Sequence, residues 1–212
     1  MAQSSALPAE QYNFDIVRRF MIVAMVYGVI GMAVGVYIAS ELAWPFLNFD
    51  LPALTFGRLR PVHTSLVIFG FGGSALFATS YYIVQRTCQA RLAFPWLAEF
   101  TFWGWTGGVA LGVITYMAGF SQGKEYAEFE WPLDLAITVV WVCYILVYVE
   151  TVRRRSQPHI YVANWFFLAF LLAVALLHIF NNIAVPVGPL KSYSLYAGVQ
   201  DAMTQWWYGH NA

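Results

Sequence analysis

The 212-residue chain is 60% hydrophobic and carries 11 basic and 11 acidic residues, so its formal net charge is zero. Charged residues make up 10% of the chain, against roughly 25% in soluble domains, which excludes an ordinary soluble domain. The zero net charge gives no indication of a nucleic-acid partner. The composition therefore indicates an integral membrane protein surrounded by a lipid bilayer.

Five apolar runs are each close to the roughly 20 residues that cross the hydrocarbon core of a bilayer. They lie at about 20–40, 62–84, 100–120, 133–149 and 161–185, and a sixth run begins near 200 and continues to 212. Lipid offers the backbone no hydrogen-bond partners, which predicts that these runs are helices. The predicted fold is all-α integral membrane, a single transmembrane domain over residues 1–212 without linker or internal repeat.

Basic residues are divided unevenly between the two sides that these helices define. The N-terminus with the second and fourth loops carries seven: Arg18, Arg19, Arg86, Arg91, Arg153, Arg154 and Arg155. The other side carries four: Arg58, Arg60, Lys124 and Lys191. Since positive residues favour the cytoplasmic side, the N-terminus is predicted to be cytoplasmic. This orientation predicts that His63, His178 and His210 share the outer half of the membrane.

The segment Arg60-Pro-Val-His63 opens the second apolar run with an ionisable side chain. Pro61 suits the first position of a helix, and His63 would then feel the positive end of the helix dipole, which favours a neutral imidazole. Gly70 and Ser74 each fall about 20° from His63 on a helical wheel, so a flat haem could lie along this stripe. Neutral imidazole ligates haem iron. The alternative is a hydrogen-bonded histidine above ordinary small-residue helix packing.

The segment Trp206-Trp-Tyr-Gly-His210-Asn211 places a histidine after three aromatic residues at the start of the sixth run. The aromatic residues alone would indicate a membrane-interface belt, whereas the histidine indicates a metal ligand or a hydrogen-bonded interior group. His178, near Asn181 and Asn182, is interpreted as part of a polar packing cluster, and His159 as a solvated loop residue.

The loop between the third and fourth runs is acidic and contains Glu125, Glu128 and Glu130. Such a loop is ordinarily a solvated surface. The alternative is an outer cation site, because carboxylates are the ligands that hard cations prefer.

Three motifs in this order, Arg60-Pro-Val-His63, Gly123-Lys-Glu-Tyr126 and Trp206-Trp-Tyr-Gly-His-Asn211, resemble catalytic subunit I of the cbb3-type cytochrome c oxidases, the C-family of haem–copper oxidases. The resemblance covers essentially the whole chain, which resembles only the N-terminal part of that twelve-helix bundle. It implies a multi-pass protein of the bacterial inner membrane. It also implies reduction of dioxygen to water with electrons from cytochrome c, coupled to proton translocation.

The resemblance assigns roles to individual residues. It implies that His63 is an axial ligand of a low-spin haem b, that His210 is a ligand of copper B, that Arg60 lies near haem propionates and that Glu125 belongs to an outer calcium site. The implied cofactors are low-spin haem b, high-spin haem b, copper B and calcium. The implied partners are c-type cytochrome subunits and cytochrome c. The remaining ligands are absent from these 212 residues, so this chain alone is not expected to be active.

Two other functions stay open. A nitric oxide reductase large subunit shares the fold and the low-spin haem histidine but uses non-haem iron in place of copper. The motif ending in His210-Asn211 favours the oxidase. A non-catalytic membrane helix bundle is the second alternative, while a transporter is disfavoured because no internal repeat is found.

Overall fold

The computed structural model describes residues 12–211. The helices are α1 (Phe14–Ala43), α2 (Phe56–Ser65), α3 (Ser74–Cys88), α4 (Pro95–Ala118), α5 (Trp131–Arg153), α6 (Val162–Asn181) and α7 (Val199–Asn211). A π-helical segment, η4 (Leu66–Gly73), joins α2 to α3, and two short 3₁₀ turns, η2 (Pro45–Asn48) and η3 (Pro52–Leu54), follow α1. Strands β1 (Ala184–Gly188) and β2 (Lys191–Ser194) form an antiparallel hairpin.

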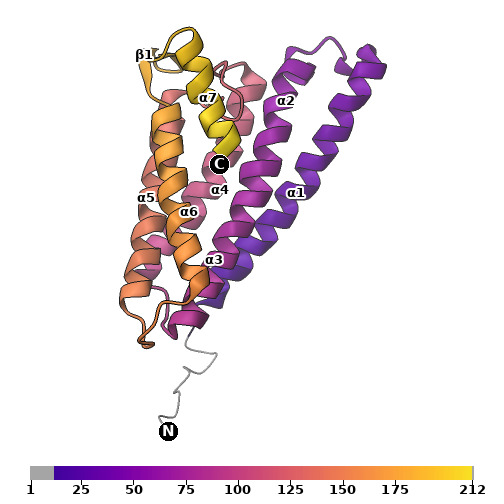
Figure 1. Ribbon diagram of the computed structural model, residues 1–212. Coiled ribbons are helices and arrows are strands. Elements are labelled where there is room, and N and C mark those ends of the chain that lie inside the picture. The colour runs from indigo at the N-terminus through magenta and orange to yellow at the C-terminus, as the bar shows by residue number, and fades with distance from the viewer. Residues whose placement is uncertain (1–11, 212) are drawn as a thin grey trace.

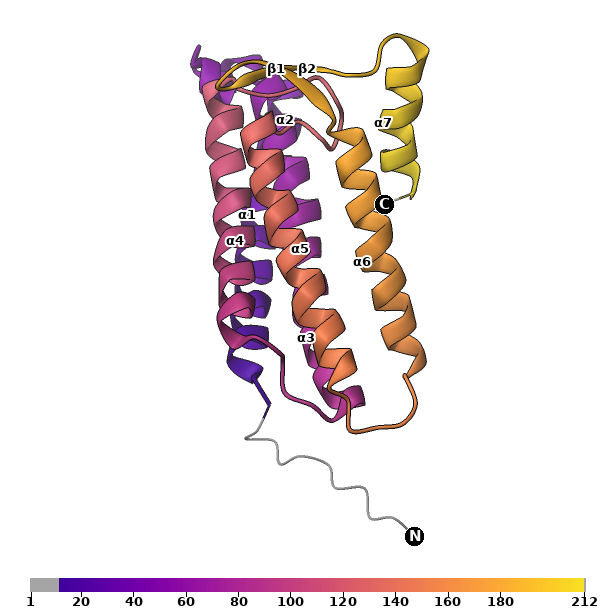
Figure 2. The same cartoon turned by 90° about the vertical axis from the view of Figure 1, so that its left-hand side faces the viewer.

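The long helices lie side by side in one elongated bundle, and the hairpin covers one end of it (Figures 1 and 2). We call this the hairpin end. Helices α2, α5 and α7 begin there, and α1, α4 and α6 end there. Helix α7 runs back from the hairpin end alongside α6, whereas α1 leans away from the other helices at that end (Figure 1).

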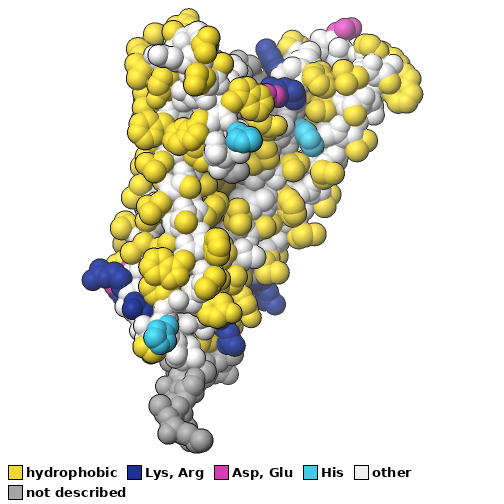
Figure 3. Space-filling model, viewed as in Figure 1, with side chains coloured by type: hydrophobic (Ala, Val, Ile, Leu, Met, Phe, Trp, Pro, Cys, Tyr) yellow, Lys and Arg dark blue, Asp and Glu magenta, His cyan; other side chains and the backbone are white. Residues whose placement is uncertain are grey.

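Four helical stretches are long and apolar enough to cross a membrane: Phe14–Ala43, Phe56–Cys88, Trp131–Arg153 and Val162–Asn181. Helix α4 has 24 residues but does not meet the same hydropathy criterion, and it packs mainly against α5 and α2. Hydrophobic side chains cover most of the visible face, and charged side chains lie near its two ends (Figure 3). The predicted all-α, multi-pass membrane fold is confirmed.

The predicted end of the fifth helix is wrong. Helix α6 stops at Asn181, and the apolar stretch around Val185 forms β1 instead, with Val185 opposite Tyr193 and a register irregularity between Pro186 and Gly188. Hydropathy cannot separate the end of an apolar helix from an apolar strand that follows it. The β-branched valines and a proline suit an edge strand better than a helix.

The prediction that Pro61 opens a helix is also wrong. Helix α2 begins at Phe56, so Pro61 lies inside it, and His63 lies near its end instead of in its first turn. The backbone then changes to π-helical hydrogen bonding over Leu66–Gly73. Proline removes one backbone donor, and π-helical turns hold more residues than α-helical turns. The wheel that aligned Gly70 and Ser74 with His63 at α-helical spacing therefore does not hold through η4.

An aromatic core fixes the helices in the middle of the bundle. Phe77 stacks on Phe20 with ring centroids 4.8 Å apart and lies 4.1 Å from the ring of Tyr144. Glycine lets the helices approach closely: a Cβ on Gly73 would lie 2.5 Å from the Trp105 ring. Interiors of this kind tolerate little change in volume, so the core gives α1, η4, α3, α4 and α5 one defined arrangement.

Candidate functional site

His63 points toward α1 from the hairpin half of the bundle. Its Nδ1 lies 2.7 Å from the carbonyl oxygen of Gly31. A carbonyl can only accept, so Nδ1 carries the proton and Nε2 is the ring nitrogen left for a metal. A backbone carbonyl on the second nitrogen is the usual way in which proteins fix the tautomer of a ligating histidine.

Close packing against α1 fixes the His63 ring. A Cβ on Gly35 would lie 2.5 Å from Cε1 and 2.7 Å from Nδ1 of His63. Glycine, which has no Cβ, therefore leaves room for the ring there. The two interpretations of His63, as a hydrogen-bonded histidine and as a metal ligand, are therefore compatible. Its hydrogen bond to Gly31 uses Nδ1 and leaves Nε2 for a metal.

Gly70 and Ser74 are both buried, and they have different surroundings. Tyr27 of α1 fills the space beside Gly70, because a Cβ there would lie 2.8 Å from the Tyr27 Cβ. Ser74 has no hydrogen-bond partner for its Oγ within residues 12–211. Their contact with a haem stays a prediction.

Arg60 binds the acidic loop that precedes α5. Its guanidinium lies 2.7 Å from Oε1 of Glu125 and 3.6 Å from Oε1 of Glu128. Glu125 is partly exposed, whereas Glu128 is buried. Burial raises the pKa of the Glu128 carboxyl above its ordinary value, and the Arg60 charge partly offsets this effect.

This burial predicts a pH effect on stability. A raised folded-state pKa means that the contribution of Glu128 is fully present below its ordinary value of 4.5 and is lost as pH rises through the folded pKa. Glu128→Gln cannot ionise, so its apparent Tm should vary less with pH from 4.5 upward than that of the parent protein. Thermal unfolding in detergent across this range measures the effect. Parallel curves for the two proteins would contradict it.

A metal cluster is not preassembled in the described part of the chain. Within residues 12–211, no group of three or more His, Cys, Asp or Glu side chains is placed to hold a metal ion. Glu125 is engaged by Arg60 at 2.7 Å, and the calcium site predicted at Glu125 stays a prediction.

His210 lies on α7, in the same half of the bundle as His63, and its side chain is exposed. At a rise of about 1.5 Å per residue, it lies roughly 17 Å along α7 from the start of that helix. Tyr208 is the buried side chain of α7, so the helix turns Tyr208 toward the bundle and His210 away from it. His159 is exposed in the loop before α6, at the opposite end of the bundle, as its sequence context predicted.

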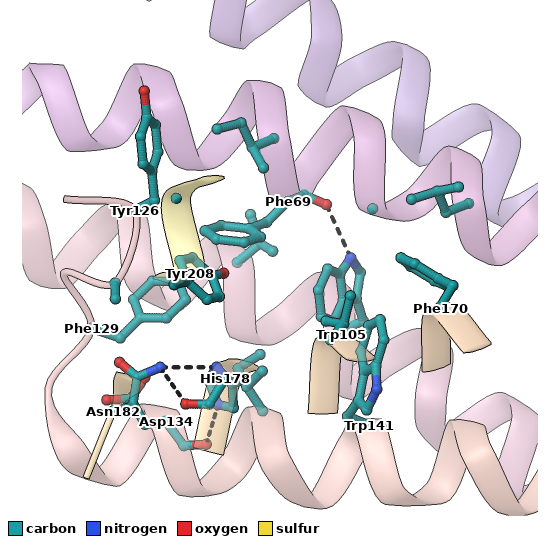
Figure 4. A pocket seen from close by; sticks show the side chains of 18 residues that line it. Phe69, Trp105, Tyr126, Phe129, Asp134, Trp141, Phe170, His178, Asn182 and Tyr208 are labelled. Carbon is teal, nitrogen blue, oxygen red and sulfur yellow. Dashed lines mark hydrogen bonds between the residues drawn. The ribbon is translucent and has the colours of Figure 1, made fainter. Parts of the chain in front are cut away.

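An apolar cavity of about 390 Å³ lies between η4, α4, α5, α6 and α7. Figure 4 shows aromatic side chains around it, with a small polar group at one side. Its aromatic lining residues are Phe69, Trp105, Tyr126, Phe129, Trp141, Phe170 and Tyr208. A cavity with such a lining can admit a small apolar molecule.

The polar side of the cavity contains His178, whose two ring nitrogens are both engaged. Nε2 lies 3.2 Å from the backbone oxygen of Asp134, and Nδ1 lies 3.1 Å from the side-chain amide of Asn182 (Figure 4). The amide donates to Nδ1, so Nε2 donates to the carbonyl. His178 therefore belongs to a polar packing cluster, as predicted.

Sequence reasoning missed Asp134. Asp134 is buried, lines the cavity, and has no hydrogen-bond partner for either carboxylate oxygen within residues 12–211. The one signal in the sequence is its spacing of four from Glu130, about one helical turn.

Comparisons with known proteins agree with these features. The family described as "Cytochrome C and Quinol oxidase polypeptide I" matches residues 15–212. The chain is 61% identical over 201 residues to the cbb3-type cytochrome c oxidase subunit CcoN1 of Stutzerimonas stutzeri, covering 95% of this chain and 42% of that protein. It is 53% identical over 206 residues to a cytochrome c oxidase subunit 1 homolog of Azorhizobium caulinodans, covering 95% of this chain and 37% of the relative.

A third relative, cytochrome c oxidase subunit 1 of Rhodobacter capsulatus, is 51% identical over 214 residues, which cover 97% of this chain and 40% of the relative. The chain thus spans about two fifths of the length of these relatives. The helical membrane bundle and the family match over residues 15–212 lead to one conclusion: this chain belongs to the cytochrome c and quinol oxidase polypeptide I family.

Proposed function

We propose that this chain is part of the catalytic subunit of a cbb3-type terminal oxidase, which reduces dioxygen to water with electrons from cytochrome c and couples this to proton translocation. The observation that carries the proposal is His63, held by its Nδ1 hydrogen bond to Gly31 with Nε2 free for a metal. The family implies haem and copper in general, and it supplies the context that His63 alone lacks.

His63 fits an axial ligand of a low-spin haem b, because its tautomer and ring position are set by α1. His210 is the proposed ligand of copper B. No group of three or more His, Cys, Asp or Glu side chains is placed to hold a metal ion within residues 12–211, and we therefore take the other copper ligands from outside the described residues. When bound, a haem–copper pair supplies the electron-transfer and oxygen chemistry, and this chain supplies ligands, orientation and packing.

The sidedness follows the basic residues. We place the N-terminus in the cytoplasm and the hairpin end at the outer surface of a bacterial inner membrane. Both His63 and His210 then lie in the outer half, where c-type cytochrome subunits and cytochrome c can deliver electrons. Arg60 is the proposed partner of haem propionates, and Glu125 the proposed calcium ligand, which would share its carboxylate with Arg60.

Gly35 gives a test of the haem site in which the His63 side chain itself is not replaced. Gly35→Ala puts a methyl group 2.5 Å from the His63 ring, so the ring must move. We expect a shifted or weakened low-spin haem absorbance in the full-length subunit. Gly107→Ala is the matched control, because nothing lies within 4 Å of a Cβ there, and it should leave the spectrum unchanged. Identical spectra for both variants would count against His63 as the ligand.

Metal analysis of the purified full-length complex tests the proposed function. The oxidase requires b-type haem and close to one copper per catalytic subunit. Iron without copper would support a nitric oxide reductase large subunit instead. A complex without b-type haem absorbance would support a non-catalytic helix-bundle component.

A further inference from the structure

Lys124 is a buried cation in the loop between α4 and α5. Its side chain is 4% exposed, and its ammonium group donates to the backbone carbonyl of Asn181. Nζ also lies 3.5 Å from Oδ1 of Asp201 and 5.4 Å from the ring centroid of Tyr196. These partners come from the end of α6, the first turn of α7 and the segment between β2 and α7, so one side chain joins four parts of the hairpin end.

The carboxylate of Asp201 is held from a second direction. The Ser194 hydroxyl of β2 donates to Oδ1 at 2.5 Å, and the same hydroxyl oxygen accepts from the backbone amide of Tyr196 at 3.2 Å. Asp201 lies in the first turn of α7, where the helix dipole favours a negative charge. The Lys124 ammonium and the Asp201 carboxylate therefore attract each other across 3.5 Å, with the ammonium shielded from solvent.

Within residues 12–211, few other contacts hold helix α7. It has 13 residues, a length at which an isolated helix is marginal, and its main neighbour is α6. Tyr208 is buried, and Trp207 contacts the ring of Phe180 at a centroid distance of 6.3 Å. A buried ion pair at the beginning of α7 therefore has a large influence on the position and rotation of the helix.

The spacing along α7 connects this pair to His210. Tyr208 follows Asp201 by seven residues, so the two lie about 20° apart on the helix. His210 follows Asp201 by nine residues, which places it about 180° away. The face that contains Asp201 and Tyr208 packs on the bundle. The face that contains His210 points outward, in agreement with the exposure of the His210 side chain.

We propose that Lys124 is a positioning residue for the metal ligand His210. Its pair with Asp201 sets the depth and rotation of α7, and thereby directs His210 away from α6 toward the ligands supplied from outside the described residues. This inference rests on the proposed copper-binding role of His210. A misplaced histidine would still be present, so the expected effect is on the geometry and retention of copper rather than on the presence of a ligand.

The test uses the full-length subunit in its complex, with Lys124→Met, Lys124→Arg and Asp201→Asn, and with Lys191→Met as the matched control. Lys191 is an exposed lysine of β2 whose Nζ lies 5.4 Å from the Tyr193 ring. Three properties are measured: copper retained against a chelator, the infrared band of carbon monoxide photolysed from haem onto copper, and the low-spin haem absorbance.

For Lys124→Met and Asp201→Asn we expect copper retention to weaken by about 10-fold or more and the carbon monoxide band to shift, while the low-spin haem absorbance stays intact. Lys124→Arg should restore the band, because arginine keeps the charge, and Lys191→Met should change nothing. An unshifted band with normal copper retention in both Lys124→Met and Asp201→Asn would overturn the proposal. If Lys124→Met does not assemble, Asp201→Asn decides alone.

The same preparation separates this inference from the proposed function. If His210→Ala keeps its copper, the copper assignment itself is wrong. If His210→Ala loses copper while Lys124→Met and Asp201→Asn keep a native copper band, His210 is the ligand and only the positioning role of Lys124 is rejected.

Discussion

His63→Ala is expected to remove the low-spin haem absorbance of the full-length subunit completely while leaving copper in place. Alanine has no donor for iron, and the hydrogen bond from Nδ1 to Gly31 has no replacement. The ring also fills the space that Gly35 leaves open, so the variant loses both the ligand and the packing around it. Under the proposed oxidase function, loss of this haem would interrupt electron transfer, so we expect oxygen consumption to fall to background.

Reduced-minus-oxidised spectra and metal analysis measure this result. His159→Ala is the matched control, because His159 is exposed at the opposite end of the bundle, and its spectra should equal those of the parent. A low-spin signal of normal intensity in assembled His63→Ala would show that another residue is the ligand. Loss of copper together with haem would indicate a failure to fold instead of a missing ligand, and Gly35→Ala would then carry the test.

His210→Ala is expected to show the reverse pattern, with copper lost, low-spin haem retained and oxygen turnover abolished. His63 lies on α2 and contacts α1, whereas His210 lies on α7, so truncating His210 leaves the packing of His63 unchanged. Because His210 is exposed on α7 and fills no space in the described bundle, its truncation should cost little stability. A chemical effect is therefore separable from a folding defect.

Copper per haem and oxygen consumption are the measurements for His210→Ala, again beside His159→Ala. Copper content equal to that of the parent would reject His210 as a ligand, even if turnover were low. The two histidine variants are expected to have opposite effects: one loses haem and keeps copper, and the other loses copper and keeps haem. A membrane bundle in which both histidines only satisfy neighbouring polar groups would show neither loss.

The class, the number of long helices and the two histidines of interest could all be predicted from the amino-acid sequence. Hydropathy is a property of each segment alone. In a bilayer, a segment satisfies its backbone hydrogen bonds mainly by forming a helix. The ends of α1, α5 and α6 could therefore mostly be predicted within several residues. His63 and His210 could be selected because ionisable residues are rare in such segments.

The groups that these residues contact could be found only in the folded chain. The Gly31 carbonyl beside His63, the Gly35 gap and the pairing of Lys124 with Asp201 join positions 28 to 77 residues apart in the chain. The π-helical segment after Pro61 and the hairpin after α6 are local, yet neither changes the hydropathy of its stretch. The physical reason is that hydropathy depends on each side chain separately, whereas the hydrogen-bond partner or ion pair of a buried polar group depends on how distant segments pack.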